Sequence, residues 1–427
     1  MKSGKRLREN IAALAMLQLL SYAAPLITVP YLVRVLGPAQ FGLLSFAQAI
    51  VLYFDLVTDY GFNFSATRAI AARRHLPEAV TRIFWSTIFA KTILMFGTGV
   101  VLTALVVLTP RLRETPQLYA VSFLYVIGTA FFPIWLFQGL EQMRVAAFVF
   151  GTARLLTVPA LFLFVRHEQD CVKAAAIQAS VQFTACVLSV PWIWKRTTLT
   201  WYCPSIRDLS ATFKEGWPLF ISGSALYLCT SSTAVILGLV AGKAEVGYFS
   251  AADKLIKAST SLLSPVTQAL YPHVTATKAE STISALQLIR KSFISIGLLS
   301  LGASLLSFTL AGPLCRVLLG PAFIASASVL QWLSPLPFLF GLMSVLGTQT
   351  MLVFELDSAM SRIMLGSALA GIPLTLSLST AFGARGAAAS SVALATIIVV
   401  AMIASLRRRG LTVWQQVAPE PFAATVS

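Results

Sequence analysis

The sequence is poor in charge, and above all in acidic charge. Only 11% of its 427 residues are charged, with 16 Asp and Glu against 32 Lys and Arg. Soluble domains carry about 25% charged residues, so a soluble enzyme or binding module is excluded. The net charge of +16 is typical of cations placed between membrane spans, and we expect no nucleic-acid partner.

Residues that hold metals or form disulfides are also few. The five cysteines are scattered without a CxxC pair, and the three histidines fall in loops or near helix ends. Neither pattern has metal-ligand spacing or the form of a disulfide framework. We therefore predict no metal site, no cofactor and no catalytic residue. The positions are Cys171, Cys186, Cys203, Cys229, Cys315, His75, His167 and His273.

Long apolar runs fill the rest of the chain, with 57% hydrophobic residues and a mean hydropathy of +0.80. The first run, 11–33, has no charge and forms a helix of roughly 34 Å, enough to cross a hydrocarbon core of about 30 Å. The sequence predicts an all-α polytopic membrane protein with about twelve spans. We place them at 11–34, 40–60, 83–108, 117–139, 145–165, 172–194, 217–240, 246–272, 292–313, 326–353, 362–382 and 386–406.

The distribution of Lys and Arg predicts the topology. If the N-terminus is cytoplasmic, 20 of these residues fall in cytoplasmic segments and 7 on the opposite side. Positive charge collects on the cytoplasmic side of membrane proteins, so we expect both termini in the cytoplasm.

An internal repeat appears when residues 36–47 are compared with residues 241–252. The matching positions are Gly37 with Gly242, Gly42 with Gly247, Ser45 with Ser250 and Ala47 with Ala252. Both copies are the turn between two predicted spans, and an even number of spans separates them. We therefore expect two parallel six-helix bundles, residues 1–208 and 209–427, around a central cavity, as in transporters.

Several segments also resemble a known family. They are Pro25–Pro38, Phe41-Gly42, Thr58–Asn63, Ser65–Arg68, Val246–Leu255 and Gln268–Pro272. These segments are similar to oligosaccharide flippases of the Wzx type, the O-antigen translocases of the multidrug/oligosaccharidyl-lipid/polysaccharide (MOP) exporter superfamily. The resemblance implies alternating access and an undecaprenyl-pyrophosphate-linked oligosaccharide as the substrate. It also implies the bacterial inner membrane as the location.

Four cations inside spans are candidates for binding the pyrophosphate. A charge in the bilayer core costs several kcal/mol, so such residues usually face a wet cavity. Arg154 lies near mid-depth, Arg34 ends the first helix, and Lys254 and Lys257 share one face of the eighth helix. Each also has a plain structural alternative, which is a helix-to-helix pair or an interfacial anchor, and for Lys257 an ion pair with Asp253.

Acidic residues inside the spans are candidates for coupling transport to H+ or Na+. They are Asp55 and Asp59, four residues apart, and Asp253. The alternative for Asp59 is an ion pair with Arg68 or Lys91. We expect Lys91 itself to extend toward the membrane surface.

Other functions remain open at this stage. Within the superfamily, a lipid II flippase or a drug exporter is the nearest alternative, although a cavity for cationic drugs would need more acidic residues. A membrane-embedded glycan polymerase or ligase has a similar hydropathy but normally a long external loop. The partners we expect are the lipid-linked oligosaccharide, membrane lipids, a polysaccharide polymerase and glycosyltransferases.

Overall fold

The computed structural model describes residues 2–196, 199–261 and 264–411. Side chains are described from residue 24 onward, except for residues 196, 222, 225, 226, 228–231, 264–266, 268, 269 and 272. Cys229 and most of the segment 268–272 therefore lie outside the described side chains. All the elements formed by the described residues are helices.

The helices of the first half begin and end as follows: α1 (Lys2–Asp59), α2 (Phe62–Arg73), α3 (Pro77–Leu108), α4 (Pro110–Arg113), α5 (Pro116–Ser122), α6 (Leu124–Phe131), α7 (Ile134–Gly139), α8 (Met143–Phe164), the short η1 (Glu168–Asp170) and α9 (Cys171–Arg196). The second half contains α10 (Ile206–Val240), α11 (Lys243–Ser261), α12 (Ser264–Glu280), α13 (Thr282–Thr309), α14 (Ala311–Leu314), η2 (Cys315–Leu319), η3 (Pro321–Phe323), α15 (Ala325–Leu333), α16 (Leu336–Met343), η4 (Ser344–Leu352) and α17 (Asp357–Arg407).

Glycines break the two longest helices. Gly37 in α1 has φ 67° and ψ 174°, and Gly383 in α17 has φ 57° and ψ −133°. Glycine adopts positive φ without the steric cost that a Cβ imposes. Both α1 and α17 are therefore pairs of helices joined at a glycine. These breaks agree with the turns predicted between 34 and 40 and between 382 and 386.

Eight segments of the described residues are long and apolar enough to cross a membrane. Two of them, Ala24–Arg73 and Asp357–Arg407, contain the breaks at Gly37 and Gly383. The prediction of an all-α, multi-pass membrane protein is confirmed, whereas the number of twelve spans stays a prediction. α11 is not among the eight, and its charges at 243, 245, 253, 254 and 257 indicate a helix that lines polar space rather than lipid.

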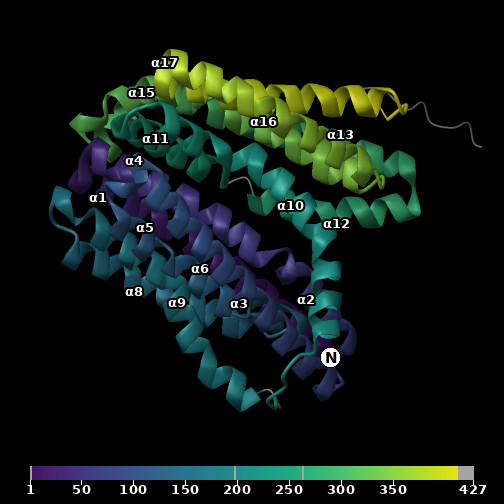
Figure 1. The fold of residues 1–427 in the computed structure, drawn as a ribbon. Coiled ribbons are helices and arrows are strands. Elements are labelled where there is room, and N and C mark those ends of the chain that lie inside the picture. The colour runs from purple at the N-terminus through teal and green to yellow at the C-terminus, as the bar shows by residue number, and fades with distance from the viewer. Residues whose placement is uncertain (1, 197–198, 262–263, 412–427) are drawn as a thin grey trace, which may run out of the picture.

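The two halves of the chain form two groups of helices (Figure 1). Helices α1–α9 lie together in the lower part of the view, and α11–α17 lie above them. We call these groups the N lobe and the C lobe. Helix α10 joins them, because it packs most extensively on α17 but also on α1, α2 and α3.

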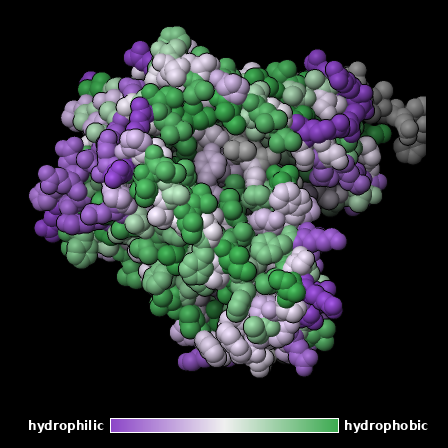
Figure 2. Space-filling model, in the orientation of Figure 1, coloured by the Kyte–Doolittle hydropathy of each residue, from purple (hydrophilic) through white to green (hydrophobic). Residues whose placement is uncertain are grey.

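The surface has the polarity of a membrane protein. Hydrophobic side chains cover most of the visible middle of the molecule, and hydrophilic side chains gather toward its edges (Figure 2). Large apolar side chains are exposed along α3 and α13, including Phe96, Leu108, Leu298 and Phe308. Exposed apolar side chains of this size are stable in contact with lipid.

The two copies of the predicted repeat lie against each other where the lobes meet. A Cβ on Gly42 would collide with the carbonyl oxygen of Lys243 and lie 2.7 Å from the backbone nitrogen of Gly247. A Cβ on Gly247 would in turn collide with the carbonyl oxygen of Pro38. These two collisions are related by the same shift as the repeat, so the backbones meet in a nearly two-fold arrangement. The glycines allow this end of the molecule to close, and we call it the glycine end.

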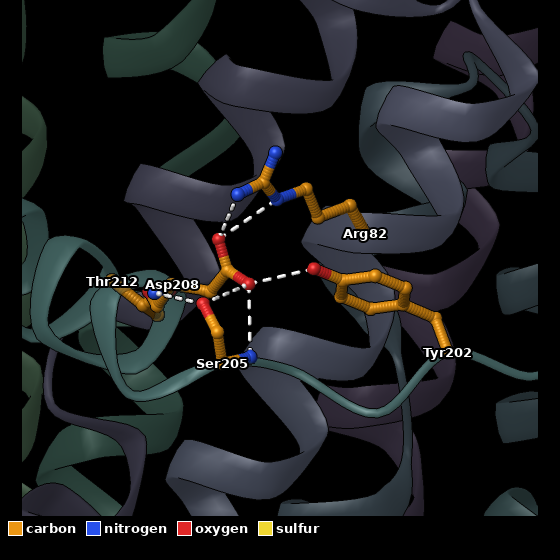
Figure 3. A network of polar contacts seen from close by, with 5 residues as sticks. All are labelled: Arg82, Tyr202, Ser205, Asp208 and Thr212. Atoms are coloured by element: carbon orange, nitrogen blue, oxygen red, sulfur yellow. Dashed lines mark hydrogen bonds and ion pairs between the residues drawn. The ribbon is translucent and has the colours of Figure 1, made fainter.

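A second contact attaches the start of α10 to the N lobe (Figure 3). The Asp208 carboxylate accepts hydrogen bonds from Arg82 Nε on α3 at 2.8 Å, from the Tyr202 hydroxyl at 2.7 Å and from the Ser205 nitrogen at 2.9 Å. Ser205 caps the helix by accepting from the Asp208 nitrogen. The hydrogen bond from Tyr202 is the largest of several contacts that lower the pKa of Asp208. Asp208 is therefore ionised at neutral pH and holds α10 to α3.

Candidate functional site

A cavity of about 550 Å³ lies between the lobes. Its walls come mainly from α1, α8 and α9 of the N lobe and from α11 of the C lobe, and Ser122 of α5, Tyr125 of α6 and Leu318 of η2 also line it. Pockets of this size hold small molecules or the head of a larger ligand. The lining includes both apolar side chains, such as Val29 and Leu255, and the charged side chains described next.

Three of the four predicted cations line this cavity. Arg154 extends from α8, and Lys254 and Lys257 extend from α11. The two lysines are three residues apart and share a helix face. The structure thus brings a cation of the N lobe and two cations of the C lobe to one space. Their role in binding stays a prediction.

The neighbours of these cations differ. Lys257 forms an ion pair with Asp253 at 2.7 Å, as its structural alternative predicted. The Lys254 ammonium lies 4.6 Å from the centre of the Phe41 ring, and the Arg154 guanidinium lies 5.7 Å from the Phe150 ring. Among the described residues, neither Arg154 nor Lys254 has a carboxylate within 4.0 Å. These two cations therefore keep their charge available to an anionic ligand.

Arg34 lies elsewhere, so the site expected from the sequence is not assembled as a whole. Its side chain is exposed, is not part of the cavity lining, and donates a hydrogen bond to the carbonyl oxygen of Val317 in η2. This contact joins the two lobes near the glycine end. The position of Arg34 after the last apolar turn of its helix explains the difference, because a side chain there reaches the end of the lobe rather than its middle.

Two of the predicted coupling carboxylates lie inside the N lobe and outside the cavity lining. Asp59 forms an ion pair with Lys91 at 2.9 Å, and Lys91 also donates to Asn63 at 3.3 Å. The Lys91 side chain is only 2% exposed, so the prediction that it extends toward the membrane surface is wrong. The Asp59 carboxylate compensates the charge of the Lys91 ammonium inside the lobe, so the ammonium does not need contact with water. The alternative of an Asp59–Lys91 pair is confirmed.

Asp55 has a different environment from Asp59. It accepts a hydrogen bond from the hydroxyl of Thr129 on α6. Among the described residues no cation lies within 4.0 Å of its carboxylate. Of the three candidates for ion coupling, Asp59 and Asp253 are thus neutralised by lysines and Asp55 is not.

A group of amides in the cavity was not predicted from the sequence. Gln48, Gln178 and Gln182 line the N-lobe wall, and the amide nitrogen of Gln48 donates to the amide oxygen of Gln178 at 2.7 Å. A glutamine inside an apolar run is a signal that could have identified them, because a polar side chain in a span usually faces a partner or a cavity. Across the described residues no cluster of His, Cys, Asp and Glu is able to hold a metal ion.

The fold is also found in solved membrane transporters. The chain is similar to a solved multidrug resistance MATE family transporter of the MOP superfamily in its inward-facing conformation, with a TM-score of 0.71, 14% identity, and 96% and 100% of the two chains covered. It is also similar to the lipid II flippase MurJ in an inward closed conformation, with a TM-score of 0.70, 11% identity, and 93% and 87% covered. These likenesses establish the fold class, which is that of a MOP transporter.

The sequence comparisons establish the family. Residues 7–278 match the family described as Polysaccharide biosynthesis protein. Two relatives are both called "Putative O-antigen transporter". The one from Escherichia coli (strain K12) is 34% identical over 95% of this chain and 98% of its own length, and the one from Shigella dysenteriae is 28% identical over 94% and 100%. The chain belongs to the polysaccharide biosynthesis protein family. It is a multi-pass bacterial membrane protein, and none of these relatives is an enzyme.

Proposed function

We propose that this chain is a flippase that moves an undecaprenyl-pyrophosphate-linked oligosaccharide, an O-antigen or similar repeat unit, across the inner membrane by alternating access. The observation that carries the proposal is a cavity between two lobes in which Arg154 and Lys254, from opposite lobes, have no carboxylate partner among the residues that the structure describes. The names of the curated relatives support the same substrate class.

The physical argument starts from the charge of the substrate. A pyrophosphate in the bilayer core costs several kcal/mol for each charge unless cations and water accompany it. Arginine binds phosphate oxygens with two parallel hydrogen bonds, and lysine acts as a compact charge. Because Arg154 and Lys254 belong to different lobes, a pyrophosphate between them would draw the lobes together. Its binding is thereby linked to lobe movement.

The proposed orientation follows from the distribution of Lys and Arg. With both termini in the cytoplasm, the glycine end lies on the periplasmic side, and its close backbone contact would keep the cavity from opening there. The lipid-linked substrate would then enter from the cytoplasmic side, where glycosyltransferases build it. A polysaccharide polymerase would use it after transport.

A lipid II flippase shares the undecaprenyl pyrophosphate and is the second candidate, supported by the fold of MurJ. The family match and the curated relatives favour the O-antigen substrate over lipid II. A drug exporter for cations is disfavoured by the cavity itself, since the part of its lining that the structure describes contains three cations and no carboxylate.

The experiment is transport by the purified protein in liposomes loaded with undecaprenyl-pyrophosphate-linked O-antigen repeat unit or with lipid II. The amount of each lipid exposed on the far leaflet is measured with an impermeant enzyme that releases the glycan. We expect rapid exposure of the repeat unit and at least 10-fold slower exposure of lipid II. If the lipids were exposed no faster than in liposomes without the protein, the result would contradict a flippase. Preferred transport of lipid II would make the second candidate the correct one.

A further inference from the structure

The two walls of the cavity differ in chemistry. Of the side chains that the structure describes, the C-lobe wall contributes Lys254 and Lys257 and one uncharged polar side chain, Ser261. Within the same described part of the chain, the N-lobe wall contributes a series of uncharged polar side chains and one charged side chain, Arg154. A single pyrophosphate group needs cations, but it does not need a wall of amides and hydroxyls.

The amides of the N-lobe wall have unused hydrogen-bonding capacity. Gln48 of α1 and Gln178 of α9 use one donor and one acceptor in their mutual hydrogen bond of 2.7 Å. A primary amide offers two donors and two acceptor positions, so each retains free groups. Gln182 lies one helical turn after Gln178 and lines the cavity as well, where a hydrogen bond joins its side chain to that of Tyr125.

A purely structural role explains only part of this arrangement. Glutamines often join helices inside membrane proteins, and the pair Gln48–Gln178 does so between α1 and α9. That hydrogen bond uses neither the amide oxygen of Gln48 nor the amide nitrogen of Gln178. Both groups are therefore available to a ligand in the cavity that the two side chains line.

The lining defines the ligand chemistry. Amides donate to and accept from neutral hydroxyl and acetamido groups, and the described lining residues include no carboxylate that would bind a cationic sugar. The rings of Tyr125 and Phe150 line the same wall, where they offer flat apolar faces. Carbohydrates combine neutral hydroxyls with apolar ring faces.

We propose that Gln48, Gln178 and Gln182 form a subsite that binds the uncharged sugars next to the pyrophosphate, so that the N lobe selects the glycan while Lys254 of the C lobe binds the phosphate. This inference rests on the proposed flippase function. It assigns substrate selection to the lobe that carries the amides.

The test compares two lipids that share the pyrophosphate, namely bare undecaprenyl pyrophosphate and undecaprenyl pyrophosphate bearing a neutral disaccharide with one acetamido group. The variants are Gln182→Leu and the double variant Gln48→Leu with Gln178→Leu. Replacing both partners of a hydrogen bond by apolar groups of similar size is nearly neutral for stability. The control is Gln331→Leu, an exposed glutamine of α15 outside the cavity lining.

We expect the unmodified protein to transport the glycosylated lipid at least 10-fold faster than the bare one. The amide variants should lose this preference and keep their rate for the bare lipid, Lys254→Ala should slow both lipids, and Gln331→Leu should change neither rate. Amide variants that keep the preference, or that slow both lipids equally, overturn the subsite alone. An unmodified protein that moves neither lipid overturns the flippase function, and the subsite with it.

Discussion

The backbones of Gly42 in the N lobe and Gly247 in the C lobe are in contact, and neither position has room for a Cβ. The two glycines are also equivalent positions of the sequence repeat, so the two copies of the repeat contact each other at matching residues. A contact between glycine backbones brings two helices closer together than larger side chains would allow. Such a contact suits an end that opens and closes during transport.

Gly42→Ala should block closure of this end, because its Cβ would overlap the Lys243 carbonyl. We expect surface glycan to fall at least 10-fold while the amount of protein in the membrane stays near that of the unmodified chain. Surface glycan is measured by immunoblot of polysaccharide extracts. Gly97→Ala on α3 is the matched control, since nothing lies within 4 Å of a Cβ there, and equal loss in both variants would show that closure is not the cause.

The pair of Asp59 and Lys91 should contribute to stability rather than to the cavity. Removing one partner leaves a charge buried without compensation, so Asp59→Asn should lower the free energy of unfolding by about 3–5 kcal/mol. The double change Asp59→Asn with Lys91→Gln should recover most of the loss. Thermal unfolding in detergent measures both effects, and an unchanged melting temperature in Asp59→Asn would contradict this role.

Asp55 is the carboxylate best placed for ion coupling. Because it has no cation partner among the described residues, H+ or Na+ can neutralise it during transport. Asp55→Asn should remove the dependence of transport on an imposed H+ or Na+ gradient, with at most a 3-fold change in the rate without a gradient. Transport rates in liposomes with and without each gradient measure the effect. A variant that keeps the full response excludes Asp55 as the coupling residue.

Asp208 should hold α10 on α3 over the whole physiological pH range. Hydrogen bonds, chiefly from Tyr202, lower its pKa in the folded protein, so its stabilising contribution is complete above the pKa of about 3.9 of an unfolded aspartate and is lost as the pH falls below that value. Trypsin cleavage after Arg207, in the first turn of α10, reports release of this contact. We expect Asp208→Asn to increase cleavage at least 5-fold at neutral pH, with Thr212→Val, which loses only a hydrogen bond to the Asp208 carbonyl, as the control.

In the unmodified protein, the fraction cleaved after Arg207 should be constant between pH 5 and pH 8 at equal trypsin activity. A rise in cleavage across this range would mean that another group controls the start of α10.

The sequence predicted what depends on local chemistry. The turns at Gly37 and Gly383, the pairing of Lys257 with Asp253 and the likeness of the two repeat copies follow from residue types at short spacing. Lys91 was placed wrongly and Arg34 lies outside the cavity lining, because depth along a helix does not say which neighbour the side chain meets. The amides of the cavity were missed for the same reason, since Gln48 and Gln178 form a hydrogen-bonded pair only because α1 and α9 lie side by side in the fold.

The central claim is that Arg154 and Lys254 hold an anionic headgroup between the lobes. It is tested most directly by surface glycan in Arg154→Ala and Lys254→Ala, compared at equal membrane levels with Arg154→Lys and Lys254→Arg and with the exposed control Lys291→Ala. A hydrogen bond to a charged group contributes about 1.5–3 kcal/mol, so the alanine variants should lose about 10- to 100-fold. Lys254→Arg should retain most activity, Arg154→Lys should retain only part of it because lysine does not form two parallel hydrogen bonds to phosphate, and the control should be unchanged. Full surface glycan in both alanine variants would contradict the account.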